Sequence, residues 1–171
     1  LAEALGGVLR EDVTATEDQP AFDRSAVDGF VVCQEDTSEE FRVTGEIRAG
    51  DGQSYGLPAG QARRIATGAA VPEGGEVIML EDAAESEGAV RFLRRGRDHV
   101  RRRGEDARAG DVLLAKGTEL GPGAIALLAS VGWVRPKVTR GLDVLHVATG
   151  NEIVPAGERP GPGQIRDSNS P

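Results

Sequence analysis

The feature that most constrains this fold is the contrast between two short helical patterns and the strand-like patterns that separate them. Apolar residues recur at helical spacing only over residues 1–9 and 121–132, where Pro122 suits a first helical turn. Between these segments, apolar and polar residues alternate, or β-rich runs follow glycine-containing turns. The pattern predicts a mainly β chain of the α+β class, with strands at Phe30–Cys33, Phe41–Ile47 and Ala89–Arg95, two strands within residues 63–82, and a glycine-rich loop over residues 48–62.

Composition limits both the core and the partners. The chain has 171 residues, 39% of them hydrophobic but only 4% aromatic, so its core must be built from Val, Leu, Ile and Ala. Its net charge of −8 argues against non-specific binding to nucleic acid. No apolar run approaches the about 20 residues that span a bilayer, so no membrane partner is expected. A single cysteine, Cys33, excludes a disulfide framework within the chain and fits a cytoplasmic setting.

The segment Leu142–Ala148, LDVLHVA, has a different character from the rest. A nearly continuous apolar run predicts a strand buried on both faces of a parallel sheet. The turn TGNE follows its carboxyl end, where open α/β sheets bind ligands. Residues from about 140 are therefore expected to be the truncated start of an α/β domain, and the chain to be a fragment of a longer protein.

Four turns carry acidic or hydroxyl side chains: Asp28 in SAVDGF, Thr67 in IATGAAVPEG, Asp106 in RRRGEDARAGD and Glu152 in ATGNEIV. Each alone is more simply explained as a turn former, and the Asp28–Gly29 pair itself predicts a tight turn. Together with nearby arginines, these groups could hold a hard divalent cation such as Mg²⁺ and a phosphorylated ligand. The sequence does not establish that the four turns are close in space.

Seven arginines fall within fifteen residues of this acidic chain. Two interpretations are about equally favoured: a solvated charged edge, or a site for an anionic ligand. An RNA-binding arm is a weaker third interpretation, because no aromatic residues are interleaved for base stacking. The residues concerned are Arg94, Arg95, Arg97, Arg101, Arg102, Arg103 and Arg108.

Four blocks resemble the molybdopterin molybdenumtransferase (MoeA/gephyrin) family, in order and at family-like spacing. They read EALGGVLREDVTATEDQPAFDRSAVDGF, IATGAAVPEGGEVIMLED, RRRGEDARAGDVLLAKGTELGPGAIALLASVG and VATGNEIVPAGERPGPGQIRDSNSP. The match covers the whole chain but only the N-terminal part of the family. The resemblance implies two intertwined domains, one formed by residues 1–24 and 108–139 and a β-rich one inserted at 25–107, followed at 140–171 by the truncated start of a molybdopterin-binding α/β domain.

The resemblance also implies an activity. Full-length members insert molybdenum from molybdate into adenylylated molybdopterin, using Mg²⁺ and releasing AMP. They are elongated homodimers whose cleft lies between the domains of two subunits. This fragment alone is expected to be inactive. The alternative is a dimerisation or scaffold module that keeps the fold without the chemistry.

Site residues are carried over from the family motifs onto this chain. The resemblance implies cleft roles for Asp28, Thr67, Asp106 and Glu152 as catalytic residues, with Asp28 and Glu152 as ligands of Mg²⁺. Retention of these four side chains favours the enzyme over the scaffold. The residues that the resemblance implies for substrate binding are Ser25, Gly68, Arg103, Asp167, Ser168 and Asn169.

Overall fold

The computed structural model describes residues 1–52 and 55–170, which form two compact units, Leu1–Val138 and Thr139–Pro171. Two residues of the predicted glycine-rich loop, Gln53 and Ser54, lie outside the described residues. Each unit is described by itself. Among the described residues, no helix is long and apolar enough to cross a membrane.

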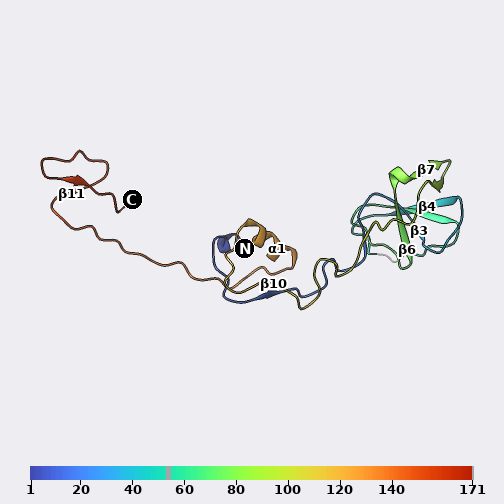
Figure 1. The fold of residues 1–171 in the computed structure, drawn as a ribbon, viewed down its shortest axis with the longest axis horizontal. Helices are drawn as coiled ribbons and strands as arrows, with labels where there is room; N and C mark the ends of the chain where they lie inside the picture. The colour runs from blue at the N-terminus through green and yellow to red at the C-terminus, as the bar shows by residue number, and fades with distance from the viewer. Residues whose placement is uncertain (53–54, 171) are drawn as a thin grey trace. The chain divides into compact units, whose positions relative to one another are not determined.

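A six-stranded sheet dominates the first unit, and Figure 1 shows β3, β4, β6 and β7 within it. The strand order is β6-β3-β5-β4-β8-β7, with β4 and β5 parallel and the other neighbours antiparallel. The predicted strands between residues 30 and 79 are confirmed, whereas β8 ends three residues earlier than expected. The strands are β3 (Gly29–Cys33), β4 (Phe41–Ile47), β5 (Gln61–Ile65), β6 (Gly75–Met79), β7 (Ala83–Ser86) and β8 (Ala89–Phe92), with the 3-10 helix η2 (Leu80–Asp82) before β7.

Strand β3 is buried on both faces because successive side chains alternate between two apolar clusters. Phe30 and Val32 pack in one cluster with Phe41 and Ile78, while Val31 packs in the other. The expectation of a core built from Val, Leu, Ile and Ala is thus corrected, because two of the four Phe residues are fully buried in it. Each large apolar side chain buried in this way stabilises the fold by about 1.5–3 kcal/mol. The centre of the sheet is therefore its most firmly held part.

Gly29 is needed at the start of β3 because β6 passes too close for any side chain. A Cβ at Gly29 would lie 2.0 Å from the carbonyl oxygen of Ile78. The prediction of a tight Asp28–Gly29 turn is therefore wrong, since Gly29 is already a strand residue paired with Ile65 and Met79. The glycine permits a close strand approach and not a turn.

A separate apolar cluster joins the two ends of the first unit, and Figure 1 shows the N-terminus beside α1. Its buried members include Leu9, Val13, Leu120 and Leu128. The predicted helix at residues 121–132 is confirmed as α1 (Pro122–Ser130), and Gly132 follows it with a φ of +72°. Within α1, Leu128 is buried and Ala129 is exposed.

The predicted helix over residues 1–9 is wrong beyond its first turn. The chain forms only the short 3-10 helix η1 (Ala2–Ala4). Gly6 has a φ of +77°, which ends helical geometry there. The following amides pair across the cluster instead, with the Leu9 N–H donating to the Thr118 carbonyl at 2.9 Å.

Two antiparallel chain segments, residues 13–25 and 100–114, connect this cluster with the six-stranded sheet. They pair through β1 with β10, through a bridge between Gln19 and Ala107, and through β2 with β9. We call this pair of segments the connector. Its strands are β1 (Val13–Thr14), β2 (Arg24–Ser25), β9 (Val100–Arg101) and β10 (Val112–Leu114).

The second unit contains one parallel pair, β11 (Ile153–Val154) with β12 (Ile165–Arg166). The predicted strand at Leu142–Ala148 is wrong for this chain, because residues 139–150 form neither helix nor strand. Leu142 and Leu145 are 90% and 89% exposed. A strand needs a hydrogen-bonding neighbour, and within the described part of this unit β11 and β12 pair only with each other.

We expect Gly29→Ala to lower the free energy of unfolding by about 3 kcal/mol, because its Cβ would force β3 away from β6. Gly123→Ala is the matched control: a Cβ there has nothing within 4 Å and lies in α1, so stability should hold or rise by about 0.5 kcal/mol. Urea unfolding measures both. Equal effects of the two substitutions would contradict this account of Gly29.

Candidate active site

The register of the sheet brings two of the predicted site residues together. Gly29, the first residue of β3, is paired with Ile65, the last residue of β5. Because the strands are antiparallel, the residue before β3 and the residues after β5 leave the sheet side by side. Asp28 and Thr67 therefore meet at this end of the sheet.

The Asp28 carboxylate is held by both donors of Thr67. The Thr67 backbone N–H and its hydroxyl donate to Asp28 Oδ1 at 2.7 and 2.9 Å. These bonds, first the backbone one and then the hydroxyl, hold the pKa of Asp28 below its usual value. Both residues are exposed, so the pair presents a fixed, ionised carboxylate that a ligand can reach.

Backbone hydrogen bonds between Ser25 and residues 68 and 69 link the segment that carries Asp28 to the segment that carries Thr67. The Ser25 N–H donates to the Ala69 carbonyl at 2.9 Å, and the Gly68 N–H donates to the Ser25 carbonyl at 2.8 Å. Gly68 has a φ of +82°, a conformation that favours glycine. Four sequence-predicted residues, Ser25, Asp28, Thr67 and Gly68, thus lie in one cluster, which we call the Asp28 cluster.

Asp106 and Arg103 lie in the connector. Asp106 forms an ion pair with Arg101, and its N–H donates to the Gln19 carbonyl at 2.8 Å. Arg103 Nε donates to Asp18 Oδ2 at 2.7 Å. Both predicted site residues therefore cross-link the connector in this structure.

Most of the arginine run is exposed, as expected for a solvated charged edge, and two of its members bind carboxylates on the opposite segment of the connector. Arg102 pairs with Asp23 at 3.0 Å, and the Arg103 N–H donates to the same carboxylate at 2.8 Å. The hydrogen bond from the Arg103 N–H lowers the pKa of Asp23 most. Partial burial of the carboxylate acts in the opposite direction, and the Arg102 guanidinium lowers the pKa further. The pKa of Asp18 is lowered by the Ala109 N–H and by Arg103.

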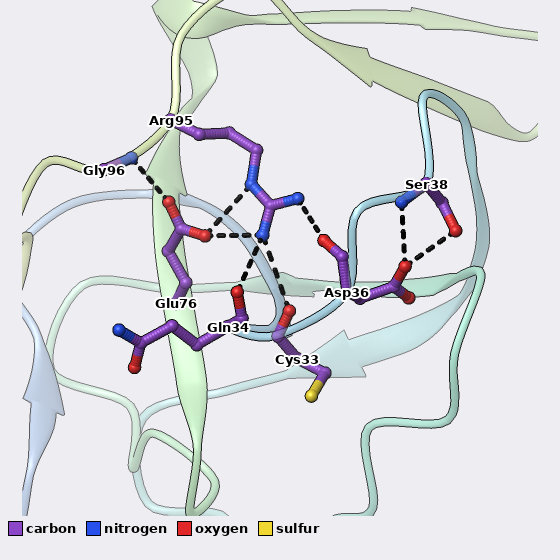
Figure 2. Close-up of polar contacts among 7 residues, drawn as sticks. All are labelled: Cys33, Gln34, Asp36, Ser38, Glu76, Arg95 and Gly96. Carbon is purple, nitrogen blue, oxygen red and sulfur yellow. Dashed lines mark hydrogen bonds and ion pairs between the residues drawn. The ribbon is translucent and has the colours of Figure 1, made fainter.

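Arg95 is likewise a structural residue, as Figure 2 shows. Its Nε and Nη2 donate to Glu76 Oε2 at 3.0 and 2.6 Å, and the same guanidinium donates to the carbonyls of Cys33, Gln34 and Asp36. A pocket of about 560 Å³ runs past Arg95 and Arg102, but its walls do not include the Asp28 cluster.

Glu152, Asp167, Ser168 and Asn169 belong to the second unit. Asp167 Oδ1 accepts the N–H groups of Asn169 and Ser170 at 3.0 and 3.1 Å, and hydrogen bonds from Ser170 and Asn169 lower its pKa. Glu152 and Ser168 are exposed. A Cβ at Gly150 would lie 2.5 Å from Glu152 Oε2, so the glycine leaves room for this carboxylate.

Sequence reasoning missed Asp18 and Asp23, which hold the arginines, and the requirement for Gly29. A signal for the first two was present, since the acids of TEDQPAFD match the arginines of RRR in number and both lie beside turn residues. No comparable signal identifies Gly29. Its role depends on a close approach by β6 that only the tertiary structure shows.

The oxygen atoms of Asp28 and Thr67 are suitable ligands for Mg²⁺, but they do not form a complete metal-binding site by themselves. Asp28 and Thr67 supply only oxygen atoms, and Mg²⁺ is commonly held by one or two carboxylates while it keeps several waters. Across residues 1–52 and 55–170, no group of three or more His, Cys, Asp or Glu side chains is placed to hold a metal ion. The two predicted ligands, Asp28 and Glu152, belong to different units.

Comparison with known proteins identifies the family. Residues 1–132 match the family model of the MoeA N-terminal region (domain I and II), so the chain belongs to this family. Molybdopterin molybdenumtransferase of Staphylococcus epidermidis is 38% identical over 181 residues, covering 100% of this chain and 43% of the relative. That of Bacillus subtilis is 39% identical over 184 residues, covering 99% and 43%.

A solved structure agrees with these relatives. The crystal structure of a molybdopterin biosynthesis MoeA protein from Pyrococcus horikoshii matches with a TM-score of 0.77 and 38% identity, covering 98% of this chain and 46% of that one. The mainly β fold expected from the sequence is thus confirmed as MoeA-like. The chain spans less than half the length of the curated relatives that it matches.

We expect Thr67→Val to raise the pKa of Asp28 part of the way to its ordinary value, since the hydroxyl bond is lost and the N–H bond remains. Thr67→Ser is the control and should leave the pKa unchanged. A carbon-13 titration of the Asp28 carboxyl measures both. Identical midpoints in Thr67→Val and the unchanged protein would contradict the assignment.

The sign of the linked stability follows from the depressed pKa. The folded state binds a proton at Asp28 less readily than the unfolded state. The contribution is therefore present above the unfolded-state pKa and is lost as pH falls through the folded one. Thr67→Val raises the folded-state pKa of Asp28 towards its unfolded-state value, so the pH range over which this stability is lost should become narrower.

Proposed function

We propose that this region forms part of the active site of a molybdopterin molybdenumtransferase, which as the longer protein inserts molybdenum from molybdate into adenylylated molybdopterin and releases AMP. The observation that carries the proposal is the Asp28–Thr67 pair, an ionised and exposed carboxylate fixed by two hydrogen bonds of 2.7 and 2.9 Å. The names of the relatives support the same reaction class.

The chemistry explains why such a carboxylate is useful. Molybdate and a phosphoanhydride are both anions, so a bare carboxylate would repel them unless a cation lies between. Mg²⁺, when bound, would supply that charge. Asp28 would hold it through the carboxylate oxygen that Thr67 does not engage, and Thr67 would keep the carboxylate ionised and fixed in direction.

The remaining predicted residues take supporting roles in this proposal. In the second unit, Glu152 would act in catalysis and as a ligand of Mg²⁺, and the Asp167–Asn169 turn would bind the substrate. Asp106 and Arg103 would act where the connector borders the cleft. Their ion pairs must then open or be shared with substrate, because both side chains are already engaged with Arg101 and Asp18.

The assembly and location are proposed from the family resemblance and from the single cysteine. The longer protein is a cytoplasmic homodimer, and its domains comprise residues 1–24 with 108–139, an insertion at 25–107, and a third domain from 140. The separate apolar clusters at the ends and in the sheet support the first two domains. In the alternative, a scaffold without catalysis, the Asp28–Thr67 pair would only link two turns.

We expect Asp28→Asn in the longer protein to lower the rate of molybdenum insertion by about 100-fold, since it removes the charge that the site presents. Glu35→Gln is the control: Glu35 is an exposed carboxylate of the same sheet domain. Molybdenum cofactor formed from molybdate and adenylylated molybdopterin is the measured product. Activity of Asp28→Asn equal to that of Glu35→Gln would reduce Asp28 to a structural turn residue.

A further inference from the structure

We propose that Ser25 is a positioning residue, which sets the direction of Asp28 and the place of Thr67 and does not touch the substrate. The inference rests on the proposed function and replaces the substrate-binding role expected for Ser25. It starts from burial: Ser25 is only 2% exposed, whereas Asp28 and Thr67 are exposed. A buried hydroxyl cannot contact a ligand held by its exposed neighbours.

The hydroxyl of Ser25 is used entirely within its own turn. Ser25 Oγ donates to the Val27 carbonyl at 2.6 Å and accepts the Val27 N–H at 3.3 Å. The Val27 carbonyl belongs to the peptide group that leads into Asp28. Holding this carbonyl fixes the plane of that peptide, and with it the direction in which the Asp28 side chain leaves the chain.

The backbone of Ser25 holds the opposite turn. Its N–H donates to Ala69 and its carbonyl accepts from Gly68, at 2.9 and 2.8 Å. These bonds lie on the two residues that follow Thr67, and so they fix where the Thr67 N–H and hydroxyl point. One buried residue thus determines both the carboxylate and its donors.

The six-stranded sheet holds the carboxyl-terminal end of residues 25–29. The Leu80 N–H donates to the Asp28 carbonyl at 3.2 Å, and Gly29 begins β3 against β6. Between this sheet anchor and Ser25 lie only Ala26 and Val27. Loss of the Ser25 hydroxyl therefore frees the Val27 N–H and carbonyl just before Asp28, while the Ala26 N–H stays bound to the His99 carbonyl at 2.8 Å and β3 keeps its pairing.

Hydrogen exchange of single amides on this chain, followed by NMR, tests the proposal directly. The Thr67 amide reports the bond to Asp28, and the Gly60 amide is a matched control because it also donates to a carboxylate, Asp36 Oδ2, at 2.6 Å. In Ser25→Ala, we expect Thr67 to exchange about tenfold faster and Gly60 to stay within about twofold. Ser25→Thr keeps a hydroxyl and should restore protection of Thr67.

Two results would overturn the positioning role. One is unchanged Thr67 exchange in a folded Ser25→Ala protein, and the other is an equal rise at Thr67 and Gly60, which signals general destabilisation. If Ser25→Ala does not fold, Ser25→Cys replaces it, since a thiol has similar size but is a weak donor. The same selective loss at Thr67 is then expected, and its absence counts against the proposal.

The catalytic consequence is measured separately in the longer protein. Ser25→Ala should lower kcat about tenfold and leave KM unchanged, because Ser25 does not bind substrate. A raised KM with unchanged kcat would return Ser25 to substrate binding. Selective loss of Thr67 protection, together with full activity of Asp28→Asn, would support the positioning role and overturn the proposed function.

Discussion

The antiparallel pairing of β3 with β5 and β6 is the constraint on which the candidate site depends. Gly29 lies opposite Ile65 on one side and Met79 on the other. This register delivers Asp28 and Thr67 to the same end of the sheet from sequence positions 39 residues apart. Burial of Phe30, Val31 and Val32 then keeps the register from slipping, since a one-residue shift would turn each side chain to the opposite face.

Several carboxylates of this acidic chain form ion pairs with arginines. In the connector, Asp18 and Asp23 bind Arg103 and Arg102, and in the sheet Glu76 binds Arg95. The connector pairs involve exposed arginines and contribute little each, about 0–1 kcal/mol, whereas the Arg95–Glu76 pair is partly buried. Their value lies in joining chain segments far apart in sequence. Asp28 differs from these acids because its partner, Thr67, is uncharged and leaves its negative charge uncompensated.

Much of the fold followed from local pattern, and the failures share a cause. The alternation at Phe41–Ile47 and the helix begun by Pro122 were predictable because each depends on nearby residues. The structures of residues 1–9 and of Leu142–Ala148 could not be predicted in this way. Residues 6–9 bond to partners distant in sequence, and Leu142–Ala148 has no neighbouring strand within the described part of its unit. The same holds for the site: side-chain types suggested Asp28 and Thr67, but only the sheet register shows that they meet.

The central claim is that Asp28 and Thr67 act as one unit, and a double-mutant cycle tests it most directly. In the longer protein, kcat/KM for molybdenum insertion would be measured for Asp28→Asn, Thr67→Val and the combination. Residues that act through each other have non-additive effects. The account predicts that the double variant is no more than about threefold slower than Asp28→Asn alone. Effects that multiply would contradict it, because Thr67 would then act on the reaction independently of Asp28.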